Sequence, residues 1–271
     1  MDLEQPLRDV TGSQAVDRAL ALLSVVGRYA ERGVSLTEIV ARTDLNKPTA
    51  RRLLLALMRA GLVEQDEQTR LYFLGEETFV LGSLASRRYG LLQMAMDGLL
   101  RLSRKTEDSS FLSVRRGAYS LCLYREEGTF PVRTHALQAG FEHPLGVGAG
   151  SLAMLAALPD DEVEAILQAN HEVLVQRYPM LPASRIRHGV AETRSIGFAL
   201  NPGLIYANSW GVGVAIMGAD GRPVGALSVA AIDSRLQPAR QAEIAGYLAE
   251  EVRKLEGRLS QVPSALGNPN K

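Results

Sequence analysis

Basic and hydroxyl side chains gather in one short segment of the N-terminal third of the chain. The cluster comprises Lys47, Thr49, Arg51 and Arg52. Arginine can form two hydrogen bonds with a guanine edge, and lysine and threonine can bind phosphate oxygens. A basic run on a helix can equally be a face that contacts only water, so the surrounding elements must decide between the two interpretations.

The elements expected around this cluster form a helix-turn-helix. Ser35 followed by Leu-Thr-Glu is a capping box, which predicts a helix from Leu36 to about Arg42. A turn over 43–46 follows, and Pro48 stands near a second helix start, where its missing amide hydrogen costs nothing. The cluster therefore lies at the N-terminal end of a helix, the part that enters the major groove in this motif. The expected buried positions of the two helices are Leu36, Ile39 and Val40, then Leu53, Leu54, Leu57 and Met58.

A further helix and a hairpin complete the expected DNA-binding domain. Ser13 is the expected N-cap of a helix that runs to about Tyr29. Strands over 62–64 and 71–74 flank a polar turn, which predicts a β-hairpin wing with Arg70 at its tip, within reach of phosphate or the minor groove. The expected buried stripe of the first helix is Val16, Ala19, Leu20, Leu23 and Val26.

A glycine-rich run suggests a second kind of chemistry in the C-terminal part. Gly-Val-Gly-Ala-Gly-Ser over 146–151 leads into a helix expected over 152–157. Free backbone amides at a helix N-terminus attract an anion, although glycines also serve tight turns and close packing. Both interpretations of this run stay open.

Alternating strands and a leucine-rich helical stretch indicate an α+β domain after the hairpin. Strands over 111–114 and 121–124 flank a glycine turn, and strands over 212–217 and 224–230 flank Asp-Gly. A further strand is expected over 132–137. The stretch 78–104 has a helical pattern interrupted by Gly90, which predicts a linker helix, a kink and the first helix of the second domain.

Composition argues against several other classes of protein. The 30 basic and 30 acidic residues cancel, so DNA contact requires a local patch of charge. No apolar run approaches the length of about 20 residues that spans a bilayer, and the N-terminus lacks the pattern of a secretory signal. We therefore expect a cytoplasmic protein with no membrane segment. The lone Cys122 lies in a strand pattern, where cysteine usually acts as a small buried apolar residue.

The sequence lacks a catalytic or metal-binding constellation. The four histidines, at 135, 143, 171 and 188, are dispersed without zinc-site spacing, and no nucleophile elbow, Walker loop or dinucleotide motif occurs. We expect no catalytic residue, no metal and no cofactor, and hence no enzyme.

The order of these motifs resembles the IclR family of bacterial transcription regulators. The resemblance is carried by SLTEIVARTDLNKPTARRLLLALMRAGLVEQDEQTRLYFLG, by HPLGVGAGSLAMLAALPDDEVEAIL and by DGRPVGALSVAAIDSRL, and it covers 13–259. It implies a winged helix-turn-helix domain over 13–77, a linker helix over 78–90 and a profilin-like or GAF-like α+β effector-binding domain with an antiparallel sheet over 91–260. The remaining residues, 261–271, are expected to be a disordered tail.

The resemblance also implies partners and an effector site. The partners are a double-stranded DNA operator, a small-molecule effector that we expect to be an organic acid, and further copies of the chain in a homodimer or homotetramer. Asn201 is expected in a polar loop before the last hairpin. The effector site residues are expected to be Ala149, Gly150, Asn201, Gly211 and Ser228.

Three positions depart from the pattern of family members that bind small carboxylates. Those members carry an acid near Asn201, a cysteine near Gly211 and a second hydroxyl near Ala230, and this chain has none of the three. The departure favours an aromatic or larger acid over a small keto acid. Trp210 and Tyr206 are expected either to line the site or to fill the core. One alternative function stays open, a DNA-binding adaptor whose second domain only dimerises.

Overall fold

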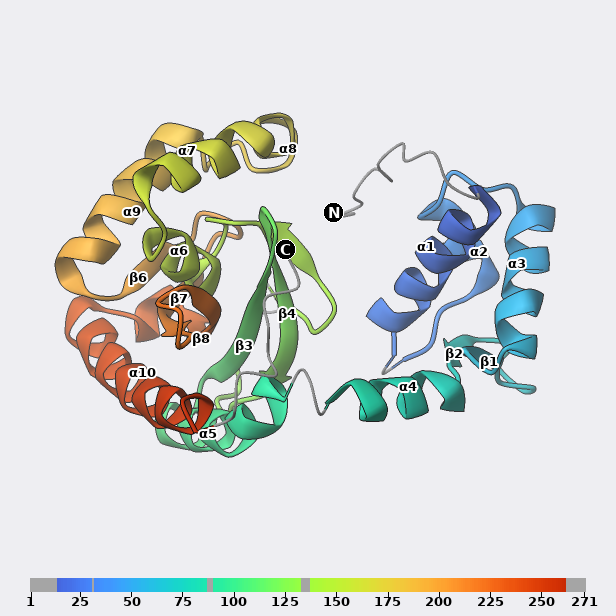
Figure 1. Ribbon diagram of the computed structural model, residues 1–271, viewed down its shortest axis with the longest axis horizontal. Coiled ribbons are helices and arrows are strands. Elements are labelled where there is room, and N and C mark those ends of the chain that lie inside the picture. Colours follow the sequence, from blue (N-terminus) through green and yellow to red (C-terminus); the bar gives the residue numbers. More distant parts are fainter. Residues whose placement is uncertain (1–13, 31, 87–89, 133–136, 262–271) are drawn as a thin grey trace. The chain divides into compact units, whose positions relative to one another are not determined.

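The computed structural model describes residues 14–30, 32–86, 90–132 and 137–261, which divide into two compact units between Tyr89 and Gly90 (Figure 1). The expected cap Ser13 and the expected tail, apart from Gln261, lie outside the described residues. The elements of the N-terminal unit are α1 (Gln14–Arg28), α2 (Leu36–Ala41), α3 (Lys47–Arg59), β1 (Val63–Gln65), β2 (Tyr72–Leu74) and α4 (Glu76–Ser86).

The predicted capping box of α2 is present. The Ser35 Oγ accepts a hydrogen bond from the Glu38 amide at 3.2 Å, and the Glu38 carboxylate accepts one from the Ser35 amide at 3.0 Å. These bonds lower the pKa of Glu38, together with the nearby Arg32. Two orphan amides are satisfied at once, so α2 begins at Leu36 as predicted.

The predicted buried face of α1 is partly wrong. Leu22, Val25 and Val26 are buried, whereas Val16 and Leu20 are about half exposed. The helix carries apolar residues on more than one side, so its periodicity allows two stripes. Packing against α3 and β2 selects the stripe that contains Leu22.

The C-terminal unit is a six-stranded antiparallel sheet with helices on both faces. The strand order is β5-β4-β3-β8-β7-β6. The strands are β3 (Ser109–Arg116), β4 (Tyr119–Glu126), β5 (Glu142–Pro144), β6 (Ala199–Pro202), β7 (Ser209–Met217) and β8 (Pro223–Ile232). The helices are α5 (Leu91–Thr106), α6 (Ala149–Ala156), α7 (Asp160–Ala169), α8 (His171–Arg177), α9 (Ala183–Ile196) and α10 (Pro238–Leu259), with a 3-10 turn η1 (Asp233–Arg235).

Alternation along the strands separates the two faces of this sheet. Leu112, Val212 and Leu227 point into a core formed with α5 and α10. The residues between them, such as Gly213 and Ser228, face α6 on the opposite side (Figure 1). The sheet therefore places one row of small and polar side chains beneath the N-terminus of α6.

Both predicted hairpins of the second unit are confirmed, but other elements differ. Asn201 lies in the short strand β6, not in a loop, because it pairs with Gly211 of β7. Val132 and Leu137, the ends of the expected strand over 132–137, are not in a strand, and 133–136 lie outside the described residues. The strand that pairs with β4 at this edge of the sheet is β5. Cys122 of β4 is buried, and burial raises the pKa of its thiol to about 12.

Two helix boundaries also differ from their predicted positions. α6 begins at Ala149, earlier than the predicted 152, because Gly148 takes a positive φ of 89° that ends the preceding turn. The helix predicted to start at 78 begins at Glu76 and ends at Ser86, and α5 starts after Gly90.

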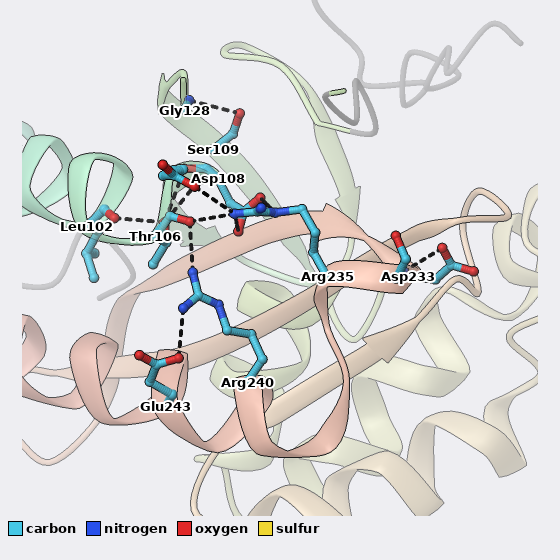
Figure 2. A network of polar contacts seen from close by, with 11 residues as sticks. Leu102, Thr106, Asp108, Ser109, Gly128, Asp233, Arg235, Arg240 and Glu243 are labelled. Atoms are coloured by element: carbon cyan, nitrogen blue, oxygen red, sulfur yellow. Dashed lines mark hydrogen bonds and ion pairs between the residues drawn. The ribbon is translucent and has the colours of Figure 1, made fainter. Parts of the chain in front are cut away.

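A polar network fixes the C-terminal end of α5 (Figure 2). The Thr106 carbonyl accepts hydrogen bonds from the guanidinium groups of Arg235 and Arg240, each at 2.9 Å. Arg235 also donates to the buried Asp108 carboxylate through Nε at 2.9 Å. Burial raises the pKa of Asp108, and Arg235 opposes that effect. Cations thus satisfy a helix-end carbonyl and a buried charge together.

Candidate functional site

The start of α3 presents its cations to solvent. The Asn46 Oδ1 caps the helix by accepting from the Thr49 amide at 2.9 Å, a role that the sequence analysis had not assigned. The side chains of Lys47, Arg51 and Arg52 are exposed and make no hydrogen bond or ion pair with any described residue. The cations lie outside the buried stripe, which comprises Ala50, Leu54 and Leu57.

The wing carries its cation on a tightly built turn. The Asp66 Oδ1 accepts from the amides of Gln68 and Thr69 and from the Thr69 hydroxyl, and these bonds lower the pKa of Asp66. Arg70 has a positive φ of 60°, a conformation that costs about 1 to 2 kcal/mol in a residue with a Cβ. Bonds between its backbone and Gln65 and Asp66 hold it there. The exposed side chain lies at the end of the turn, two residues before β2 begins at Tyr72.

A cavity lies between the sheet of the second unit and the first turn of α6. The cavity measures about 60 Å³, within a surrounding space of about 550 Å³ that includes open solvent at its mouth. All five residues of the predicted effector site border it: Ala149, Gly150, Asn201, Gly211 and Ser228. Its other lining residues are Phe111, Ser113, Ser120, Leu137, His143, Val147, Gly148, Ser151, Ile205, Ser209, Trp210, Val229 and Ala230.

Small residues bring α6 into direct contact with the sheet. A Cβ on Gly213 would lie 2.6 Å from the Ala149 carbonyl carbon, and one on Gly150 would lie 3.2 Å from the Ser228 Oγ. The packing interpretation of the glycine-rich run is therefore correct for Gly150. The same close approach places the start of α6 beside the hydroxyl of Ser228.

The first turn of α6 offers unpaired donors. Its N-cap, Gly148, has no side chain to cap the helix. The amides of Ala149, Gly150 and Ser151 have no acceptor among the described residues. Helix-terminal amides of this kind bind carboxylates and phosphates, because the helix dipole adds a partial positive charge there.

Buried polar side chains around the cavity also lack partners. Each of the five is at most 8% exposed, and none forms a side-chain hydrogen bond within the described part of the chain. None of their side-chain polar atoms is fully enclosed, so a polar molecule or water in the cavity can form hydrogen bonds with them. The five are Ser113, Ser120, Asn201, Ser209 and Ser228.

Sequence reasoning missed three of these five, Ser113, Ser120 and Ser209. The signal that could have found them is the two-residue alternation of the strands, which sets Ser113 on the same face as Phe111. The Ser151 hydroxyl, by contrast, already has partners within the protein, because it accepts a hydrogen bond from the Gly146 amide and donates one to the Pro144 carbonyl.

Among the described residues that border the cavity, His143 is the one with a titratable side chain. Its Nδ1 lies 2.8 Å from the Tyr178 hydroxyl oxygen. Burial lowers its pKa to about 4, so the ring is uncharged at neutral pH. No Lys, Arg, Asp or Glu is among the described residues that line the cavity, so any charge on a ligand would meet only dipoles.

Of the two aromatic residues whose role the sequence left open, Trp210 has both expected roles and Tyr206 has neither. Trp210 lines the cavity and also packs against the sheet core. Tyr206 is more than one-third exposed and is not among the lining residues. No described helix is long and apolar enough to cross a membrane, and no cluster of possible metal ligands occurs in the described ranges.

Comparison with known proteins covers both units. Residues 15–67 match the model of the IclR helix-turn-helix domain, and 84–257 match that of the bacterial transcriptional regulator IclR C-terminal domain. The HTH-type transcriptional regulator BhcR of Paracoccus denitrificans is 28% identical over 91% of this chain and 88% of its own length.

Solved structures show the same architecture. A putative IclR transcriptional regulator from Silicibacter sp. TM1040 has a TM-score of 0.71 and 28% identity, covering 94% of this chain and all of the other. An IclR homologue from Microbacterium hydrocarbonoxydans, complexed with 4-hydroxybenzoate, has a TM-score of 0.73 and 20% identity over 92% of this chain and all of its own.

Proposed function

Because the chain belongs to the IclR family of bacterial transcription regulators, we propose that an organic anion bound in the cavity beneath α6 controls its affinity for DNA. Like its curated relatives, the chain is a DNA-binding regulator; it is not an enzyme. What we propose is which kind of anion binds and which residues hold it.

The observation that carries this proposal is the unpaired polar lining of the cavity. Amides of Ala149 and Gly150 would bind the anionic group, and the Ser228 hydroxyl, which Gly150 approaches closely, would add a directional bond. Asn201 supplies an amide from β6, and Gly211 leaves room for the ligand. The 4-hydroxybenzoate in the Microbacterium homologue supports an aromatic acid as the class of ligand.

We propose that DNA is contacted by polar residues at the start of α3 and in the wing of the N-terminal unit. Lys47, Thr49, Arg51 and Arg52 would enter the major groove, and Arg70 of the wing would reach the backbone or minor groove. A homodimer or homotetramer would read a roughly palindromic operator in the cytoplasm, where the chromosome lies. Sedimentation of the full chain tests the assembly, and a monomer that binds single half-sites would contradict it.

A Ser228→Met variant tests the effector site. DNA affinity is measured on a duplex selected from random sequence, with and without members of a panel of organic acids. We expect the acids to shift DNA affinity in the native chain and not in Ser228→Met, because the new side chain fills the cavity. Ser234→Met, which changes an exposed serine outside the cavity, should respond like the native chain.

Two results would count against the effector proposal. If no acid of a chemically diverse panel raises the unfolding temperature or shifts DNA affinity, the result favours the adaptor that the sequence left open. If Ser228→Met responds as the native chain does, the ligand binds elsewhere.

A further inference from the structure

The cavity has a second polar region at His143, which lies on β5, three strands away from Ser228 of β8. Gly150 contacts Ser228, whereas the next residue, Ser151, donates to the Pro144 carbonyl. Pro144 follows His143 on the edge strand β5, and His143 pairs with Ser120 of β4. The strands between them, β3 and β4, contribute Phe111, Ser113 and Ser120 to the lining, so Ser228 and His143 border different parts of one cavity.

One nitrogen of His143 is left for a ligand. Nδ1 is engaged by the Tyr178 hydroxyl, and no described residue bonds Nε2. Nε2 is also absent from the fully enclosed polar atoms that lack a partner, although the residue is only 3% exposed. Because His143 lines the cavity, the accessible side of Nε2 is the cavity itself.

We infer that Nε2 of His143 is a second recognition point and that it selects a monocarboxylic acid with an uncharged hydroxyl group at its other end. This inference rests on the proposed function, because it requires the effector to occupy this cavity. It adds a residue that the resemblance to the family did not indicate, and it narrows the class of ligand.

The hydroxyl follows from the chemistry of a neutral imidazole. Nε2 donates in one tautomer and accepts in the other, and a hydroxyl can pair with either. A second carboxylate would need a cation or several donors to offset its desolvation, and no charged side chain lines the cavity in the described residues. The body of the ligand would lie against Phe111, Val147 and Trp210, which suits an aromatic or other apolar skeleton.

Tyr178 acts as a positioning residue in this arrangement. Its hydroxyl holds the imidazole through Nδ1, and the two rings meet edge to face with centroids 6.1 Å apart. Neither ring needs to move for Nε2 to meet a ligand, so recognition would be largely preformed.

Two matched sets of acids test the inference on the full-length chain by titration calorimetry at pH 7.5. One set is benzoate, 4-hydroxybenzoate and terephthalate. The other is 3-phenylpropionate, its 4-hydroxyphenyl analogue and its 4-carboxyphenyl analogue. In at least one set, we expect the hydroxy acid to bind about five to ten times more tightly than its parent, the gain of one neutral hydrogen bond, and the dianion to bind most weakly.

Variants assign the preference to His143. In His143→Phe the ratio of affinities between hydroxy acid and parent should fall to about one, whereas His188→Phe, at an exposed histidine outside the cavity, should keep the native ratio. If His143→Phe fails to fold by circular dichroism, Tyr178→Phe provides the second test, because loss of the anchoring hydroxyl should weaken the same ratio.

The outcomes separate this inference from the proposed function. If acids bind in a Ser228-dependent manner but show no preference for the hydroxyl, the inference alone is overturned. The same holds if the preference for the hydroxyl survives His143→Phe. With Tyr178→Phe as the test, an unchanged ratio would also overturn it. Failure of every acid to bind, or binding indifferent to Ser228→Met, would overturn both.

Discussion

At the scale of single residues, Arg51 is the sharpest test of the proposed DNA surface. It is exposed near the start of α3 and has no partner among the described residues. Arg51→Ala should cost about 1 to 3 kcal/mol on the selected duplex and relax specificity at one base pair. Arg59→Ala, at the exposed end of the same helix, is the matched control for charge alone. Equal losses on specific and scrambled duplexes would mean that Arg51 contacts only phosphate.

His143 makes the stability of the second unit depend on pH. Its pKa is about 4 in the folded chain against 6.5 for an unperturbed histidine, so the unfolded chain takes up the proton first. The stabilisation is complete above pH 6.5 and is lost as the pH falls, by about 2 to 3 kcal/mol at pH 4.5.

Urea unfolding at pH 7.5 and 4.5 measures this loss. In His143→Gln most of this pH-dependent loss of stability should disappear, because glutamine does not titrate. In His188→Gln the loss should be as large as in the native chain. A loss of the same size in His143→Gln would place the responsible proton elsewhere.

The contacts of a side chain could be predicted from the sequence where they belong to a local motif. The capping box of Ser35 and Glu38 and the exposed start of α3 follow from sequence spacing alone. The partnership of His143 with Tyr178 joins residues 35 positions apart, so spacing could not reveal it. The unpaired serines of the cavity depend in the same way on the order of the strands.

At the scale of elements, the network at the end of α5 should be important for stability (Figure 2). Arg235→Ala would leave the Asp108 carboxylate, which is 2% exposed, without its closest cation. We expect a loss of about 3 to 5 kcal/mol in the unfolding free energy of this unit. Arg187→Ala breaks a pair with Glu164 in which both side chains are about half exposed, and it should cost at most about 1 kcal/mol. Similar losses in the two variants would contradict this distinction.

Elements were predictable when turn or cap chemistry marked both ends. The hairpins around Gly117 and Gly221 and the helices α2 and α3 lie where the sequence indicated them. The short strands β5 and β6 were missed, since three or four residues show no clear alternation and form strands only by pairing with a longer neighbour.

At the scale of the whole molecule, charge is balanced and recognition is local. The chain carries as many acidic as basic residues, so attraction to DNA requires a local patch of charge, which we propose is formed by the exposed cations of α3 and the wing. The order of domains was predictable from the succession of motifs, because each unit has its own core.

The central claim is that a ligand in the cavity changes DNA affinity, and the most direct test is the reciprocal one. If an acid changes DNA affinity by some factor, saturating DNA must change the affinity for the acid by the same factor. Titration calorimetry with the tightest-binding acid, with and without the selected duplex, measures that factor. We predict equal factors in the native chain and a factor of one in Ser228→Met. An acid that binds the native chain with the same affinity in the presence and absence of DNA would contradict the account.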